Sequence, residues 1–116
     1  MKNRILTIGL LLLTVSLGTA QTKGSKTEKA EFIVSGNCEM CKKRIEQASL
    51  SVKGVKKVEW DIPSNVLSVI YNAKKQDINA IHEAIAAAGH DTDRTRAPED
   101  VYESLPLCCL YEREQQ

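Results

Sequence analysis

Three short segments of the chain carry the alternation of apolar and polar residues that is typical of β-strands. They span residues 31–34, 55–62 and 66–71. In the third segment, Leu67, Val69 and Tyr71 are separated by single residues, so they would share one face of a strand. The Pro-Ser-Asn turn at residues 63–65 joins the last two segments and predicts a hairpin.

Two other segments have the spacing of an amphipathic helix. The first begins near Met40 and stops at Gly54, whereas the second can be capped by Asp77 and stops at Gly89. The apolar positions are Ile45 and Ala48 in the first helix and Ile78, Ile81, Ile85 and Ala88 in the second.

The predicted elements follow one another in the order β-α-β-β-α. This is most of an α+β, ferredoxin-like βαββαβ sandwich, in which two helices cover one face of an antiparallel sheet. We expect the fourth strand to be short or at an edge, because residues 91–96 have little apolar content. Beyond it, Pro98 predicts the first turn of a short helix that runs to Ser104.

The N-terminal segment differs from the rest of the chain. Lys2 and Arg4 precede a short apolar run, and the small residues Gly-Thr-Ala at 18–20 precede Gln21. This layout predicts a secretory signal peptide cleaved near Ala20, with an uncleaved anchor as the alternative. We therefore expect a protein of the periplasm or a secreted protein, whose mature form does not span the membrane.

The pattern divides the chain into four parts. They are a signal peptide at 1–20, a flexible leader at 21–29, a folded domain at 30–96, and a C-terminal extension at 97–116 that carries the short helix and Cys108-Cys109. The formal net charge is +1, and aromatic residues make up 4% of the chain. This composition argues against a nucleic-acid-binding surface. The basic run at 42–44 is either a docking face for an acidic partner or an ordinary solvated helix face.

Four cysteines lie beyond the predicted signal peptide, in two close pairs. Cys38 and Cys41 are two residues apart where the first helix should begin. The helix N-terminus and the basic residues at 42–44 should lower the pKa of both thiols and favour the thiolate. Because thiolates select soft metal ions, the pair predicts an open two-thiolate metal site.

Two other interpretations of Cys38 and Cys41 remain open. They could be inert core cysteines or a plain disulfide, or they could be the dithiol centre of a thiol-disulfide oxidoreductase. Two features argue against the oxidoreductase. The chain is short for a thioredoxin-sized sheet, and no aromatic residue immediately precedes Cys38.

The sequence resembles the heavy-metal-associated domain family over roughly residues 31–92. The matching segments are Phe32-Ile33-Val34, Cys38-Glu39-Met40-Cys41 with Ile45, Gly54-Val55, Leu67-Ser68-Val69-Ile70-Tyr71, and Ile81 through Ile85 to Ala88-Gly89. The resemblance implies a metallochaperone or a scavenger, not an enzyme, of the copper-chaperone or periplasmic mercury-binding type. It implies copper(I) as the first expectation, with mercury(II), silver(I), zinc or cadmium as other ions that thiolates bind. It also implies transfer to a partner, such as a metal-transporting membrane protein or another metal-binding domain, and we expect a monomer.

Three positions qualify this resemblance. Gly36 occupies the place of a family methionine that packs inward and shapes the metal loop. His90 lies in a loop that in the family borders the metal loop, so it is either a third ligand or proton-linked neighbour, or an exposed loop histidine. We expect His82, on the second helix, to be solvated.

Cys108 and Cys109 form the second pair and lie outside the resemblance. They could fold over Cys38 and Cys41 to make a three- or four-thiolate site, form a separate weak site, or form a disulfide with the first pair. The sequence leaves these alternatives open.

Overall fold

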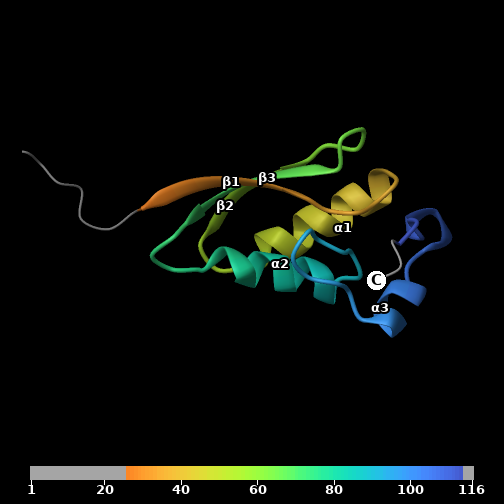
Figure 1. The fold of residues 1–116 in the computed structure, drawn as a ribbon. Coiled ribbons are helices and arrows are strands. Elements are labelled where there is room, and N and C mark those ends of the chain that lie inside the picture. Colours follow the sequence, from red (N-terminus) through yellow and green to blue (C-terminus); the bar gives the residue numbers. More distant parts are fainter. Residues whose placement is uncertain (1–25, 114–116) are drawn as a thin grey trace, which may run out of the picture.

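The computed structural model describes residues 26–113 and contains a three-stranded antiparallel sheet with two main helices against it. Figure 1 shows the sheet as one layer and the helices α1 and α2 as a second layer beneath it. This arrangement confirms the ferredoxin-like α+β fold. The predicted signal peptide at 1–20 and the first part of the leader lie outside the described residues.

The sheet has the strand order β1-β3-β2. Its strands are β1 (Thr27–Ile33), β2 (Val55–Trp60) and β3 (Val66–Asn72). Leu67 of β3 is the register partner of Phe32 on β1 and of Trp60 on β2, so large side chains from all three strands meet at one level. The strand β1 begins earlier than predicted, and residues 27–29, which we expected in the flexible leader, pair with β3.

The two main helices are α1 (Glu39–Leu50) and α2 (Ile78–Ala87), close to the predicted bounds. The Asp77 side chain caps α2 by accepting a hydrogen bond from the Asn79 backbone N–H at 2.8 Å. Gly54 and Gly89 follow the helices with φ values of 94° and 105°, a conformation in which a side chain would be strained. Both glycines therefore mark the points where the chain leaves a helix and turns back to the sheet.

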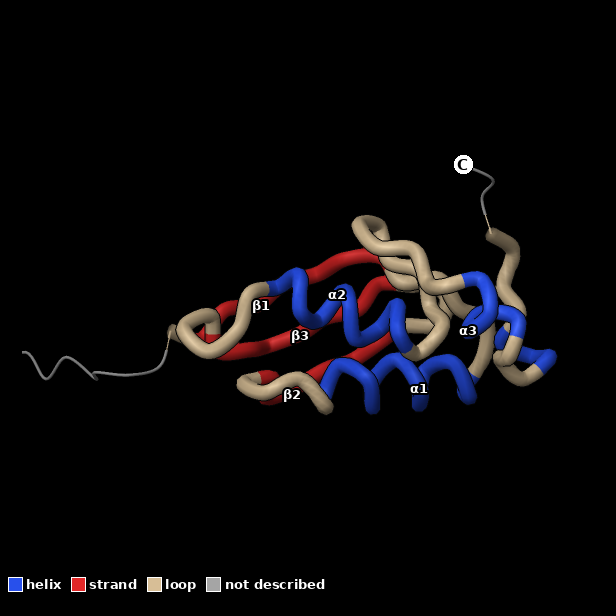
Figure 2. The backbone as a smooth tube through the Cα atoms, turned by 90° about the horizontal axis from the view of Figure 1, so that it is seen from below, coloured by secondary structure: helices blue, strands red, loops and turns tan. Residues whose placement is uncertain are grey.

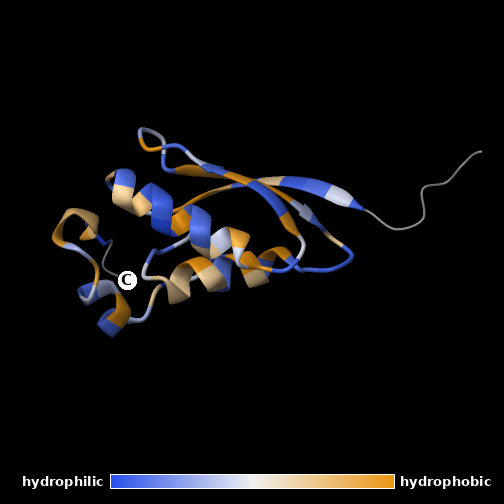
Figure 3. Cartoon of the chain, turned by 180° about the vertical axis from the view of Figure 1, so that it is seen from behind, coloured by the Kyte–Doolittle hydropathy of each residue, from blue (hydrophilic) through white to orange (hydrophobic). Residues whose placement is uncertain are grey.

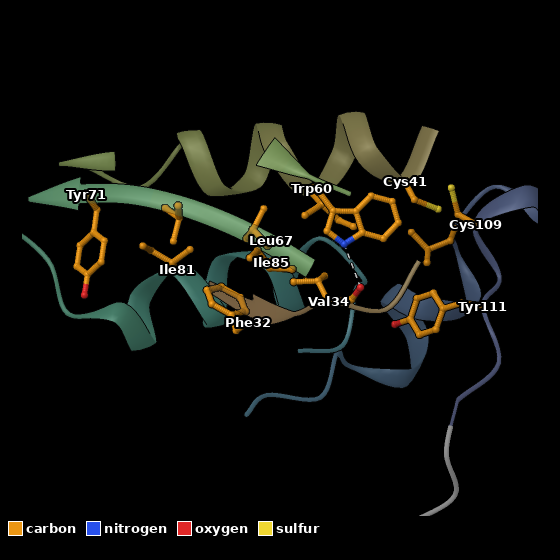
Figure 4. Packing of buried hydrophobic residues seen from close by; sticks show 13 residues of the cluster. Phe32, Val34, Cys41, Trp60, Leu67, Tyr71, Ile81, Ile85, Cys109 and Tyr111 are labelled. Carbon is orange, nitrogen blue, oxygen red and sulfur yellow. Dashed lines mark hydrogen bonds between the residues drawn. The ribbon is translucent and has the colours of Figure 1, made fainter. Parts of the chain in front are cut away.

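The core lies between the sheet and the helices, as the buried cluster in Figure 4 shows. The alternation predicted for β3 is confirmed, because Leu67, Val69 and Tyr71 are buried while the residues between them are partly exposed. The helix positions Ile45, Ile81 and Ile85 are fully buried against this face. Figure 3 shows that apolar and polar residues are interspersed along both helices, as expected of helices with one buried face.

The predicted fourth strand is reduced to a single bridge between Val34 and Thr92. The chain then forms the predicted short helix, α3 (Glu99–Glu103), and one 3₁₀ turn, η1 (Leu107–Cys109). Pro98, which we expected in the first turn of this helix, is its N-cap residue. Figures 1 and 2 place this extension beside the end of the sandwich where α1 begins. Among residues 26–113, no helix is both long and apolar enough to cross a membrane.

Candidate metal centre

The first cysteine pair lies where the chain leaves β1 and enters α1. Cys38 is the N-cap residue of α1, with extended backbone, and Cys41 lies in the first turn of the helix. The two sulfur atoms are 3.5 Å apart. Cys41 is fully buried, whereas Cys38 is partly exposed, so the pair has one anchored sulfur and one that solvent can reach. The predicted placement of both residues at the helix start is confirmed.

The helix start changes the acidity of Cys38. The backbone N–H of Cys41 is the main influence, and together with further hydrogen bonds from neighbouring groups it lowers the pKa of the Cys38 thiol to about 7, against the opposing effect of burial. The basic residues at 42–44, which we expected to contribute, are not among the main causes of this shift in the pKa of Cys38. Lys42 pairs with Glu46 at 2.9 Å, and Arg44 donates to the carbonyl of Ala88 at 3.1 Å.

The loop at residues 35–38, which leads into α1 and which we call the metal loop, rests on Trp60. The indole ring of Trp60 is fully buried beneath this loop. The indole N–H donates to the carbonyl oxygens of Val34 and Asn65 at 3.1 and 3.2 Å, and Figure 4 shows the first of these bonds. A Cβ atom on Gly36 would stand 2.9 Å from Cη2 of this ring and 3.1 Å from Cβ of Cys41. Trp60 therefore fills the space beside the loop, and Gly36 leaves room for it.

His90 is fully buried, so the alternative of an exposed loop histidine is wrong. Its Nδ1 lies 2.9 Å from the carbonyl oxygen of Ser35, to which it donates as the protonated ring nitrogen. Burial lowers the pKa of His90, which favours the neutral ring. Its buried Nε2 has no hydrogen-bond partner among the described residues. The role of His90 as a third ligand stays a prediction.

His82 is also buried, and the expectation of a solvated residue is wrong. Its ring stacks on Phe32 of β1 with the centroids 3.8 Å apart, and its Nδ1 lies 2.6 Å from the hydroxyl oxygen of Thr92. His82 thus faces the sheet and joins the core. This contact lies away from the cysteines and gives the residue a packing role.

The C-terminal extension brings the second cysteine pair to the first. The sulfur of Cys109 lies 3.8 Å from that of Cys38 and 4.0 Å from that of Cys108. The sulfurs of Cys38, Cys108 and Cys109 all lie within 4.8 Å of one another. Cys109 is fully buried, Cys108 is exposed, and all four thiols are free. The structure therefore brings the two pairs together, as a shared metal site or a disulfide between the pairs would require.

Contacts of other residues in the extension hold it in this position. The Tyr111 hydroxyl donates to the carbonyl of Gly89 and accepts from the Asp91 N–H, both at 2.8 Å. Arg113 forms two hydrogen bonds with the Asp91 carboxylate, at 2.7 and 2.9 Å. Leu105 packs on Gly89, where an added Cβ would stand 2.8 Å from one of its methyl carbons. Both ends of the segment that carries Cys108 and Cys109 are thus tied to the loop after α2.

Sequence reasoning missed three residues of this region. Trp60 was interpreted only as a strand residue, although a glycine in the metal loop and a single tryptophan in the chain hint at complementary packing. Met40 was placed between the ligands without a role, yet its Sδ lies 3.4 Å from the sulfur of Cys108. Arg113 had no sequence signal, because its partner Asp91 is distant along the chain.

The four thiols can bind a soft metal ion, because thiolate and thioether sulfurs are the ligands that such ions prefer. Cys38 and Cys41 supply one partly exposed and one buried sulfur, and the extension supplies two more. The identity of the ion does not follow from the donors alone.

Comparison with solved structures supports this interpretation. The chain is similar to a CopZ metallochaperone, with 26% identity and a TM-score of 0.55, over 56% of this chain and 98% of that one. It is similar to oxidised MerP from Ralstonia metallidurans CH34, with 25% identity and a TM-score of 0.55, over 58% and 94%. A third match is the Cu(I)-loaded N-terminal domain of a potential copper-translocating P-type ATPase from Bacillus subtilis, with 31% identity and a TM-score of 0.54, over 57% and 84%.

Comparison with curated protein sequences gave no match. Residues 31–91, however, match the heavy-metal-associated domain, and they include the end of β1, the elements from α1 to α2, and both Cys38 and Cys41. The extension that carries Cys108 and Cys109 lies outside the matched segment. Because the matched segment makes up more than half of the chain, the protein belongs to the heavy-metal-associated domain family.

Proposed function

We propose that this protein is a carrier or scavenger of monovalent copper that binds the ion through Cys38 and Cys41. The observation that carries the proposal is the pair of sulfurs 3.5 Å apart at the start of α1, one buried and one reachable from solvent. A partly exposed thiolate can exchange an ion with another protein, whereas a closed tetrahedral site retains it. The proposed role is binding and delivery and not catalysis.

Two observations favour copper among the soft ions. The similar structures include a metallochaperone and a domain solved with Cu(I) bound. In addition, the thioether of Met40 lies beside the cysteines, and thioethers together with thiolates suit monovalent copper. Zinc, cadmium and silver remain ions that the same thiolates would bind in vitro.

Titration of the reduced protein with copper(I) against a competing chelator tests the proposal. The wild-type protein should take copper from the chelator, and Cys38→Ser/Cys41→Ser should do so at least tenfold less effectively. The matched control is Ser51→Ala, which changes an exposed position just beyond the end of α1. Equal affinity of the wild type and the double variant would overturn the proposal.

A mercuric-ion scavenger that supplies a membrane transporter is the second candidate, and the similarity to MerP favours it. Mercury(II) also binds pairs of thiolates, so binding alone does not separate the two ions. A competition in which the protein is offered both ions in a thiol-containing buffer separates them. Retention of copper supports the first proposal, and exclusive retention of mercury supports the second.

A thiol-disulfide oxidoreductase is the candidate from another class. The low pKa of Cys38, about 7, is compatible with such chemistry. We propose the carrier instead, because the buried thiol of Cys109 lies 3.8 Å from the Cys38 sulfur and offers a further metal ligand. Catalytic reduction of insulin disulfides by the metal-free protein would support the oxidoreductase.

We also propose that the protein is exported and delivers its ion to a metal-transporting membrane protein or to another metal-binding domain. The apolar run before Gln21 supports export. The similarity to an ATPase domain supports a transporter as the partner. Mass analysis of the protein from the periplasm should show Gln21 as the first residue, and retention of residues 1–20 would contradict cleavage.

A further inference from the structure

We propose that Cys38, Cys108 and Cys109 form a three-thiolate position for a soft monovalent ion, which shares Cys38 with the pair at the start of α1. This inference rests on the proposed function and deepens it, because it adds ligands from outside the family domain. The extension then acts as part of the metal site as well as a cover over it.

The spacing of the three sulfurs fits trigonal coordination. With metal–sulfur bonds of about 2.3 Å, the length found in zinc thiolates, three ligands in a plane stand about 4 Å apart. The Cys38–Cys109 and Cys108–Cys109 sulfur distances are 3.8 and 4.0 Å, and all three sulfurs lie within 4.8 Å of one another. Only small side-chain rotations would therefore be needed to coordinate one ion.

Cys41 is not one of these three residues. Its sulfur lies 3.5 Å from that of Cys38, on the buried side of the loop. Figure 4 shows Cys41 and Cys109 next to each other at one end of the core cluster, one from α1 and one from the extension. Cys38 thus belongs to both sets of ligands, since its sulfur lies close to that of Cys41 and to that of Cys109.

The position is built into the folded molecule. Cys109 is fully buried, and η1, which carries both tail cysteines, packs against α1. The backbone is fixed on either side of the pair, since the N–H of Cys109 donates to Pro106 at 2.7 Å and Tyr111 anchors the chain two residues later. An ion at this position would gain ligands that are already held in place, which reduces the entropic cost of binding.

The surrounding chemistry selects a soft ion. The Sδ of Met40, on α1, lies 3.4 Å from the sulfur of Cys108 and offers a thioether at the rim of the three thiolates. Sulfur donors of this kind favour monovalent copper or silver over ions that prefer oxygen ligands. Three thiolates around one monovalent ion would also hold it more firmly than two, which suits retention by a scavenger.

Copper(I) binding by Cys41→Ser tests the proposal in the full chain. This variant removes the two-thiolate pair but keeps Cys38, Cys108 and Cys109, and the serine hydroxyl can still accept the N–H bond from Asn37. We expect one copper ion per protein, with three sulfur neighbours by X-ray absorption. The matched variant Cys41→Ser/Cys109→Ser should bind at least tenfold more weakly. No binding by folded Cys41→Ser, or equal binding by both variants, would overturn the proposal.

The complementary variant Cys108→Ser/Cys109→Ser separates this inference from the proposed function. It keeps only the pair at the start of α1 and should bind copper through two sulfurs. If the wild type shows the same two-sulfur spectrum and affinity as this variant, the three-thiolate position fails while the proposed function stands. If this variant binds nothing while Cys41→Ser binds copper, the proposed two-thiolate site fails and the inference stands. Circular dichroism of each variant confirms that it is folded.

Discussion

The two cysteine pairs of this protein are held in place in different ways. Cys38 and Cys41 are positioned locally, by the start of α1 and by the indole of Trp60 under the metal loop. Cys108 and Cys109 are positioned from a distance, by contacts that Tyr111 and Arg113 make with the loop after α2. The first pair belongs to the family domain, and the second is an addition to it.

This difference indicates how an open metal site can gain ligands without a change of fold. The sandwich keeps its core and its helix start, and the extension adds sulfurs from one side. The two pairs also differ in acidity. The helix start lowers the pKa of Cys38 to about 7, whereas burial raises the pKa of Cys109. The pairs should therefore respond differently to mutation, to pH and to chemical modification.

The largest effect should come from Trp60→Ala, which removes the support of the first pair. Trp60 is fully buried, and large-to-small changes of this kind cost about 3–5 kcal/mol of unfolding free energy. Chemical unfolding of the metal-free protein measures the loss. Trp60→Phe keeps part of the ring volume and should cost less. A loss below 1 kcal/mol for the alanine variant would show that the loop does not depend on this residue.

Arg113→Ala should have a smaller effect, confined to the second pair. The Arg113 side chain is 7% exposed and holds Asp91 through two charged hydrogen bonds, so its removal should cost about 2 kcal/mol. Hydrogen exchange should show faster opening at residues 105–111 than in α1. The neighbouring exposed residue provides the control, and Glu112→Ala should change neither quantity. Equal protection of the extension in both variants would contradict this role of Arg113.

Limited alkylation of the reduced, metal-free protein compares the thiols directly. Cys108 is the more exposed residue, but the neighbouring sulfur of Cys38 raises the pKa of its thiol, and desolvation adds to this effect. Because the thiolate is the reactive form, Cys38 should be modified first at pH 7.5, by roughly tenfold or more. Peptide mass spectrometry measures the order. In Cys38→Ala, Cys108 no longer has a thiolate beside it and should react faster, and modification of Cys108 before Cys38 in the wild type would contradict the assignment.

The smallest effect should be a loss of stability in acid that originates at the ion pair of Asp91 and Arg113. Burial alone would raise the pKa of Asp91, but the hydrogen bonds from Arg113 and from the Ala97 N–H hold it below the usual value. A lowered folded-state pKa means that this stabilisation is present above the unfolded value of about 3.9 and is lost as the pH falls below it. Unfolding between about pH 5 and pH 1 measures the decline, which should be weaker in Asp91→Asn. An identical decline in both proteins would exclude this origin.

Local patterns were sufficient to predict most of the sandwich. Alternation in β3, the Asp77 cap and the isoleucines of α2 all act over a few residues, so the sequence pattern carries them directly. The position of Cys38 and Cys41 at a helix start was predictable for the same reason. The strand boundary at Thr27 was missed because the polar residues before Phe32 gain their partners from β3.

Features that depend on distant contacts were not predictable in the same way. His82 was expected in solvent, but its burial depends on Phe32, which lies on another element. The placement of Cys108 and Cys109 depends on Arg113, Asp91 and Gly89, whose proximity appears only in the folded chain. The sequence therefore identified Cys108 and Cys109 as candidate ligands, but their proximity to Cys38 could be seen only in the folded chain.

The copper(I) affinity of Cys38→Ser is the most direct test, because Cys38 is the one ligand common to the pair at α1 and to the three-thiolate position. Competition with a chromogenic chelator, in parallel with the wild type and with Cys108→Ser, measures this affinity. We predict that Cys38→Ser binds at least tenfold more weakly than either of the other two proteins. Wild-type affinity in Cys38→Ser would contradict the account.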